Sequence, residues 1–376
     1  MKKYFLLIVV VCILFCGCSG TTDNSEIKII NKKWETIGKN LSLGNAISTA
    51  ITVDNSGNPI VAYTDNGNSD IISVVKFINN KWINIGENNV STKSCYVKKI
   101  IVDKEDNIYL LYLDYSVKVG NNFLVKPTVK KYNGSYWEVL GSERFTNFDT
   151  LYIDMEIDNN NNIYIAMNNN DDSNKLIIYK FNNGNWDIMS NNITDSISGI
   201  KLLIDTNNVI YIICTNTKSY TAGSMNCLLV KRFINGIWEN LENEEFNKYV
   251  YGFSACLDKN NDLYVVKNEY KISNLNMIKY SNNSWSNIGV VDEADSYGDI
   301  ILMSNSENVL SLFYDQIYLG QIKEYINNKW TNGNFVSSDK VLEASMAISK
   351  NNVVYVAFED GENSFKLSVK KYEEIE

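Results

Sequence analysis

Residues 53–65 read Val-Asp-Asn-Ser-Gly-Asn-Pro-Ile-Val-Ala-Tyr-Thr-Asp, and this pattern occurs seven times in the chain of 376 residues. An apolar run ends at a short polar residue, a four-residue turn rich in Asn and Gly follows, and a second apolar run ends at an acid or amide. Short polar side chains bond nearby backbone groups in such turns, and Asn and Gly tolerate left-handed conformations. The β-branched and aromatic flanks predict a pair of antiparallel strands.

Two columns of polar residues align across the seven copies. The first opens the turn and consists of Asp54, Asp103, Asp158, Asp205, Asp258, Ser304 and Ser349. The second lies eleven positions later, at the end of the second strand, and consists of Asp65, Asp114, Asn169, Asn216, Glu269, Asp315 and Asp360. A repeat of this kind indicates one structural unit used seven times.

Every tryptophan of the chain occupies one place in this repeat, and in four copies an Ile/Leu-Gly pair follows it, as in Trp82-Ile83-Asn84-Ile85-Gly86. The seven are Trp34, Trp82, Trp137, Trp186, Trp238, Trp285 and Trp330, spaced 45 to 55 residues apart. Repeats of about this period, built of short strands and turns, are typical of propeller blades, which bury their faces only against neighbours. We therefore predict an all-β, seven-bladed β-propeller over residues 27–376, with four antiparallel strands in each blade and the tryptophans packed between blades.

The chain begins inside a repeat. Residues 27–37 match the last hairpin of a blade, with its Trp34, whereas residues 365–372 form a third strand with no tryptophan after it. The N-terminal strand is therefore expected to complete the last blade and close the ring, which leaves no unpaired sheet edge at the junction.

Two lysines, an apolar run over residues 4–15 and the sequence Gly17-Cys18-Ser19 precede the repeats. This segment resembles a bacterial lipoprotein signal. The resemblance implies a signal peptide at residues 1–17, lipidation of Cys18 with palmitate-type chains, and a tether at residues 18–26. It also implies a membrane-anchored protein of the bacterial cell envelope, at the outer membrane if the cell has two membranes. An uncleaved hydrophobic anchor is the alternative.

The composition excludes several kinds of chemistry. The chain has no histidine and only two arginines, Arg144 and Arg232. Histidine-based nucleophiles, general bases and metal sites are therefore absent, and we expect no cofactor and no metal. The formal net charge of −9 argues against nucleic acid as a partner. A glycoside hydrolase or lyase that uses only paired carboxylates remains open as an alternative.

Four cysteines lie beyond Cys18: Cys95, Cys214, Cys227 and Cys256. Cys214 ends a second strand and Cys227 begins the third strand of the same repeat. A disulfide between these two is one alternative in an oxidising compartment, and buried thiols are the other.

Candidate ligand-binding residues follow from the loops. The long, irregular connections all leave the strands at the end that carries the second polar column, and binding residues concentrate on such loops. Tyrosine beside acids suits a sugar or a protein ligand equally. The candidates are Asp65, Asp114, Tyr115, Tyr220, Glu269, Tyr270, Tyr297, Asp315 and Asp360. The alternative for the acids is that each caps its own turn.

The repeat, clearest at residues 53–65, resembles bacterial surface and secreted β-propeller repeats and is similar in period to fucose-binding propeller lectins. In such lectins sugars lie between blades beside arginine and acids, and this chain departs from them in having only two arginines. We interpret the protein as a monomeric envelope lipoprotein and a non-catalytic, lectin-like binding module for a glycan or protein ligand. A scaffold for an envelope complex is a further alternative.

Overall fold

The computed structural model describes residues 32–374 except 87–88, 191–192, 195, 221–222, 243–245, 247, 270–273 and 294–297, and it leaves out the side chains of 218–220 and 223–225. The expected signal peptide, Cys18 and the tether lie outside the described residues. None of the described residues forms an α-helix, and no helix that could span a membrane is found among them.

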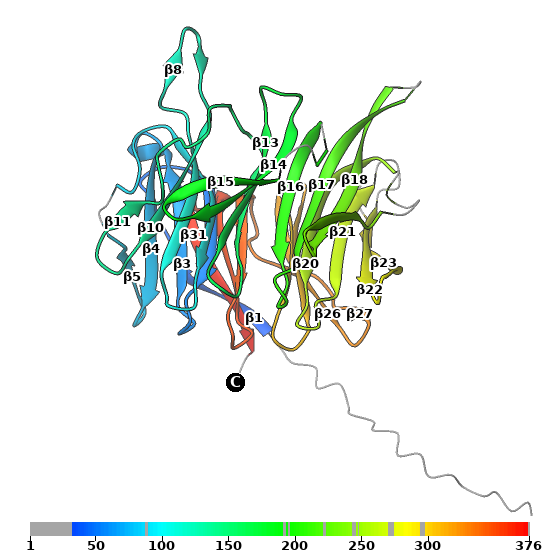
Figure 1. The fold of residues 1–376 in the computed structure, drawn as a ribbon. Coiled ribbons are helices and arrows are strands. Elements are labelled where there is room, and N and C mark those ends of the chain that lie inside the picture. Colours follow the sequence, from blue (N-terminus) through cyan, green and yellow to red (C-terminus); the bar gives the residue numbers. More distant parts are fainter. Residues whose placement is uncertain are drawn as a thin grey trace, which may run out of the picture.

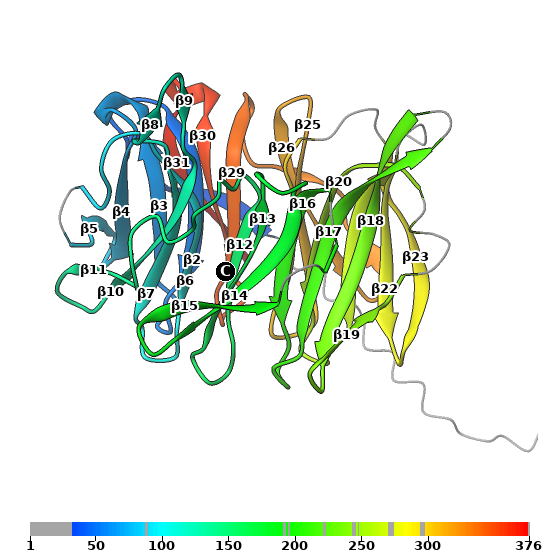
Figure 2. The same ribbon diagram turned by 45° about the horizontal axis from the view of Figure 1, so that its top comes forward.

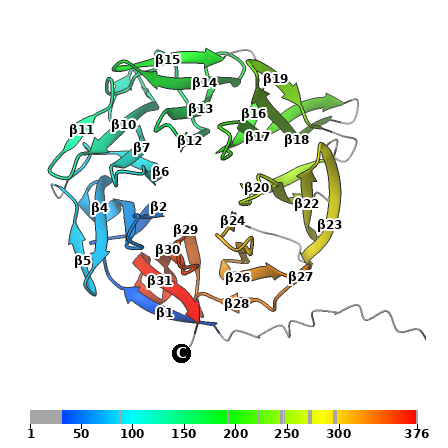
Figure 3. The same ribbon diagram turned by 60° about the horizontal axis from the view of Figure 1, so that its bottom comes forward.

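Seven antiparallel sheets stand around a common axis like the blades of a propeller, as predicted (Figure 3). Strands A to D run from the axis outward in each blade. Blade 1 holds β2 (Ala46–Val53), β3 (Pro59–Asp65), β4 (Ile71–Ile78) and β5 (Lys81–Asn84). Blade 2 holds β6 (Cys95–Val102), β7 (Ile108–Asp114), β10 (Lys126–Tyr132) and β11 (Trp137–Val139), with a hairpin of β8 (Lys118–Val119) and β9 (Asn122–Phe123) inserted between strands B and C.

The next four blades continue around the ring. Blade 3 holds β12 (Ile153–Ile157), β13 (Ile163–Asn169), β14 (Lys175–Asn182) and β15 (Asn185–Ser190). Blade 4 holds β16 (Ile197–Ile204), β17 (Ile210–Tyr220), β18 (Gly223–Ile234) and β19 (Ile237–Asn240). Blade 5 holds β20 (Val250–Leu257), β21 (Leu263–Glu269), β22 (Asn274–Ser281) and β23 (Ser284–Glu293). Blade 6 holds β24 (Ile300–Ser304), β25 (Leu310–Gln316) and β26 (Leu319–Ile326), with its outer strand split into β27 (Lys329–Trp330) and β28 (Asn334–Phe335).

Blade 7 joins the two ends of the chain, which confirms the predicted closure. It holds β29 (Val341–Ile348), β30 (Val354–Asp360) and β31 (Lys366–Glu374), and β1 (Lys32–Gly38) adds the outer strand. β1 pairs antiparallel with β31, with Trp34 opposite Tyr372. The outer edge of β31 is therefore covered by the start of the same chain.

The ring has two unlike faces. A–B and C–D turns lie on one face, which we call the turn face, and the longer B–C and D–A connections lie on the other, the loop face. The β8–β9 hairpin and the ends of β17 and β18 project from the loop face (Figures 1 and 2), whereas β1 begins at the turn face (Figure 1). Two single 3-10 turns, η1 (Asn66–Asn68) and η3 (Gly361–Asn363), are B–C connections of blades 1 and 7.

The tryptophan motif joins neighbouring blades. The Trp137 indole N–H donates to the Ile85 carbonyl of blade 1 at 2.9 Å, and a Cβ at Gly86 would lie 2.7 Å from the Trp137 ring. Three Ile/Leu-Gly pairs, at residues 37–38, 85–86 and 140–141, therefore receive the tryptophan of the following blade. The same donation runs from Trp82 to Ile37, from Trp186 to Leu140, from Trp238 to the Ser190 hydroxyl and from Trp285 to Leu241. The apolar core likewise lies between blades, in seven clusters.

The structure corrects the alignment of blade 6. Ser304 pairs with Leu310, as Val53 pairs with Pro59 in blade 1, so Asn305 rather than Ser304 opens the A–B turn. By the same shift, Gln316 is the equivalent of Asp65, and Asp315 lies one position earlier. The sequence did not reveal this one-residue offset because Ser304 and Asn305 are both polar, as are Asp315 and Gln316.

The disulfide alternative for Cys214 and Cys227 is wrong. Cys214 lies opposite Leu229 and Cys227 lies opposite Asn216, and the structure contains no disulfide between them. Residues offset by two along paired strands have Cα atoms about 7–8 Å apart, beyond the reach of a disulfide. All four described cysteines are buried.

Candidate functional site

The second polar column forms turn caps rather than a set of open ligand groups. The Asp65 carboxylate is buried and accepts hydrogen bonds from the backbone N–H groups of Leu43, Gly44 and Gly67. Asp360 is also buried and accepts from the Glu362 N–H and, at 2.7 Å, from the Ser368 hydroxyl. These acids hold the B–C connections η1 and η3, which is the capping alternative considered from the sequence.

The next two predicted acids are occupied by protein cations. Asp114 accepts from the Ser116 N–H and from Arg144 at 2.8 Å. Glu269 lies 2.6 Å from Lys267, and both side chains are buried. Burial and existing partners leave little of either carboxylate for a ligand.

The remaining candidate ligand-binding residues are Asp315 and four tyrosines. Asp315 accepts from the backbone of Gly298 and Asp299, and burial raises the pKa of Asp315. Tyr115 is half-buried, with its ring 5.0 Å edge-on from Tyr96. Tyr270, Tyr297 and the side chain of Tyr220 lie outside the described residues. The predicted residues that the structure describes are therefore not brought together in one site.

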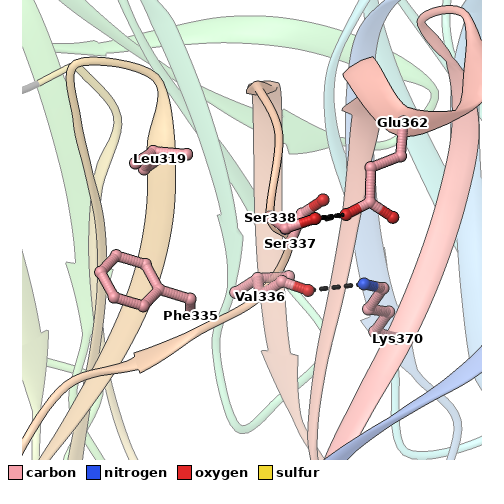
Figure 4. A pocket seen from close by; sticks show the side chains of 7 residues that line it. All are labelled: Leu319, Phe335, Val336, Ser337, Ser338, Glu362 and Lys370. Carbon is pink, nitrogen blue, oxygen red and sulfur yellow. Dashed lines mark hydrogen bonds between the residues drawn. The ribbon is translucent and has the colours of Figure 1, made fainter.

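A cavity of about 410 Å³ opens between blades 6 and 7 at the loop face (Figure 4). We call it the blade 6–7 pocket, and it is lined by Leu319, Phe335, Val336, Ser337, Ser338, Glu362 and Lys370. Leu319 and Phe335 stand on one side and Ser338, Glu362 and Lys370 on the other, so an apolar wall faces a polar one. Phe335 is 59% exposed, so much of its ring is open to solvent.

The polar wall is held in place by its own hydrogen bonds. The Glu362 carboxylate accepts from the backbone N–H and the hydroxyl of Ser338, and these bonds lower the pKa of Glu362 to about 2. Asp360 caps the turn that carries Glu362. Lys370 donates to the Val336 carbonyl at 2.6 Å. A fixed carboxylate acceptor therefore faces the cavity at any pH above about 3.

The apolar wall continues into an exposed turn. Ile317 and Tyr318 join β25 to β26 with φ of 53° and 67°, and Ile317 is 75% exposed. A β-branched residue at positive φ is a backbone outlier, and such strain is concentrated at functional sites. Lys340 lies 5.4 Å from the centre of the Tyr318 ring.

Sequence reasoning missed this pocket, although a signal was present. After Trp330 the chain reads Thr-Asn-Gly-Asn-Phe, without the apolar residue that stands three positions after every other tryptophan. This departure splits the outer strand and leaves β28, with Phe335, at the pocket. The repeat gave no signal for Glu362. In its turn only the capping residue, Asp360, belongs to an aligned column.

Charged residues also lie on the innermost strands. The Lys99 ammonium is 3.0 Å from Asp154 and 2.9 Å from Glu156. Glu359 lies on β30, the second strand of blade 7. Burial and the neighbouring Glu343 raise the pKa of Glu359 to about 7. Glu359 is only 6% exposed, so little of its carboxylate is open to a substrate. Among the described residues, no group of three potential ligands could hold a metal ion.

The fold is similar to those of solved propellers. An ulvan lyase of a new polysaccharide lyase family superposes with a TM-score of 0.57 at 13% identity, covering 89% of this chain and 95% of that one. The polysaccharide lyase Uly1 gives 0.54 at 9% identity, covering 88% and 90%. The fucose-specific lectin from Aleuria aurantia gives 0.49 at 14% identity, covering 79% and 97%. No protein-family model matches the chain, and no curated protein matches it in sequence.

Proposed function

We propose that this protein is a non-catalytic, glycan-binding module that holds its ligand in the blade 6–7 pocket. The observation that carries the proposal is the pairing of an exposed aromatic ring, Phe335, with a fixed carboxylate, Glu362, across one open cavity. Sugar rings present C–H groups on their faces and hydroxyls on their edges. An aromatic wall suits the former and an ionised acceptor suits the latter.

The fold is compatible with this role. Propellers that act on or bind glycans share the architecture, but the low identity restricts that likeness to the fold. The proposal for this chain therefore rests on the pocket itself. It assigns no role in bond cleavage to Glu362, because its low pKa makes it a poor proton donor near neutral pH.

We further propose that Cys18 is lipidated and anchors the protein in the bacterial cell envelope. The first described strand, β1, begins at the turn face. An anchor joined there by a short tether would hold the turn face toward the membrane and leave the loop face with its pocket turned outward. Mass spectrometry of the membrane fraction would test this, because loss of acylation in Cys18→Ala is the expected result.

A glycan array tests the binding function. We expect saturable binding to a defined set of glycans, reduced at least about tenfold in Phe335→Ala and in Glu362→Gln. Tyr136→Ala is the matched control, because Tyr136 is 59% exposed in a C–D turn on the opposite face. Binding that is equal in all four proteins would refute the pocket as the site.

A protein ligand on the same face is the second candidate. Large exposed apolar side chains lie on several loop-face connections: Leu43 before β2, Val119 and Phe123 on the β8–β9 hairpin, and Ile317 and Tyr318 between β25 and β26. Exposed apolar side chains such as the pair on the β8–β9 hairpin favour contact with a protein partner. Crosslinking in intact cells distinguishes the candidates: a protein captured by the wild type and lost in Val119→Ser/Phe123→Ser favours docking, while unchanged glycan binding in that variant keeps the pocket separate.

A further inference from the structure

A row of equivalent residues follows the innermost strands around the axis. Each lies three positions before the last residue of strand A, and the row consists of Ala50, Lys99, Asp154, Lys201, Ser254, Ile301 and Ser345. We call it the inner row. Side chains of the row reach the following blade: Asp154 accepts from the Leu202 N–H at 3.0 Å, and Ser254 accepts from the Leu302 N–H at 3.0 Å.

Lys99 shows what a lysine in this row requires. Its ammonium meets two carboxylates of the next blade, Asp154 in the row and Glu156 two residues later, at 3.0 and 2.9 Å. A partly buried ammonium is costly unless such partners compensate for lost hydration.

Lys201 occupies the same place two blades on, without those partners. The positions that correspond to Asp154 and Glu156 hold Ser254 and Cys256, which are neutral and shorter. Among the residues that the structure describes, the Lys201 ammonium has no hydrogen bond and no ion pair. Repulsion from Lys99, followed by burial, lowers the pKa of Lys201.

The two neutral residues at these positions, Ser254 and Cys256, can donate hydrogen bonds. The Ser254 oxygen accepts from Leu302, which leaves its hydroxyl hydrogen to donate. Burial raises the pKa of the Cys256 thiol, so the thiol keeps its proton. Asp154 and Glu156 are within electrostatic reach, but Lys99 engages both, and Asp154 also holds the Leu202 N–H.

We propose that the axis of the ring holds a second binding site, in which Lys201, Ser254 and Cys256 bind the carboxylate group of a small ligand. The ligand carboxylate takes the place that Asp154 and Glu156 fill for Lys99. Solvent reaches the innermost strands, because Lys98 and Tyr251 are exposed and Lys201 is only half-buried. The site is independent of the blade 6–7 pocket and of the function proposed for it.

NMR of the protein labelled with carbon-13 lysine tests this site. We expect sodium acetate, at constant ionic strength against chloride, to shift the Lys201 Cε resonance saturably and to leave the Lys99 resonance unchanged. Lys201→Met should remove the shifting resonance, while the other lysine resonances stay in place and report that the ring is folded. No saturable shift with acetate, or a shift with sulfate alone, would overturn the carboxylate site.

A second variant supplies the carboxylates within the chain. Ser254→Asp/Cys256→Glu recreates the surroundings of Lys99 around Lys201, so it should raise the Tm in chloride and abolish the acetate response. An acetate response that survives in a folded double variant would contradict the site. If that variant does not fold, the Lys201→Met comparison decides alone.

Discussion

At the scale of single residues, the tryptophan indole N–H groups distinguish two kinds of blade junction. Trp137 donates to the Ile85 carbonyl at 2.9 Å, whereas the buried Nε1 atoms of Trp34 and Trp330 have no hydrogen-bond partner within the described part of the chain. Trp34 lies at the junction of blades 6 and 7 and Trp330 at the junction of blades 5 and 6, so the exceptions flank blade 6. The tryptophan hydrogen bond of the repeat is therefore missing on both sides of blade 6.

This difference predicts unequal costs for one substitution. Trp137→Phe leaves the Ile85 carbonyl without its donor and should lower the free energy of unfolding by about 1–2 kcal/mol more than Trp330→Phe does. Trp330→Phe removes a buried donor that has no partner, so part of its loss of packing is offset. Urea unfolding of both variants measures the difference, and equal losses would contradict it.

Glu359 predicts a pH-dependent stability effect. Its folded pKa of about 7 lies above the unfolded value near 4.5, so the folded state holds an extra proton between these pH values. The stability contribution is present below pH 4.5 and is lost as pH rises through 7, up to about 3 kcal/mol. Glu359→Gln should therefore raise the free energy of unfolding at pH 8 and change it little at pH 4. The same change at both pH values would refute this.

At the scale of elements, the A–B turn is the most regularly repeated feature of the described blades. Asp158 is buried, and its carboxylate accepts from the N–H groups of Asn160 and Asn162. In blade 7 the Ser349 hydroxyl accepts from the Val353 N–H in the corresponding way. The same turn is therefore closed by either side chain.

This exchange can be tested within blade 3. Asp158→Ala should cost roughly 1–3 kcal/mol, because it leaves turn N–H groups without an acceptor. Asp158→Ser should cost less, because serine restores one acceptor as in blade 7. Thermal unfolding of both variants provides the measurement, and a serine variant no more stable than the alanine variant would count against the capping account.

Strands and turns could be predicted from the sequence because their signals repeat seven times. The hairpin of β2 and β3 and the place of Trp82 follow from spacing alone. The ligand role considered for Asp65 and Asp114 could not be decided that way, because a capping acid and a binding acid have the same pattern. Their partners, Gly44 and Arg144, come from irregular connections with no repeat. The offset at Asn305 was hidden because Ser304 and Asn305 are both polar.

At the scale of the whole molecule, the ring depends on one short strand. β1 is seven residues long and pairs along β31, with Trp34 against Tyr372 at a ring distance of 4.9 Å. Without it, β31 would present an open edge, which is a site for aggregation.

Deletion of residues 1–40 should therefore lower the Tm and promote aggregation, because blade 7 loses its outer strand. Deletion of residues 1–31 is the matched control and leaves β1 in place. Differential scanning calorimetry with light scattering compares the two. Equal Tm values and equal scattering would show that closure by β1 contributes nothing to stability.

We propose ligand binding on the loop face between blades 6 and 7; from the sequence only the face could be predicted. Hydrogen–deuterium exchange with and without a glycan selected on the array tests that placement most directly. We predict protection of residues 334–341 and 361–364 on binding, with no change in the A–B turns of the opposite face. Protection confined to the turn face, or to the β8–β9 hairpin, would contradict the blade 6–7 pocket as the binding site.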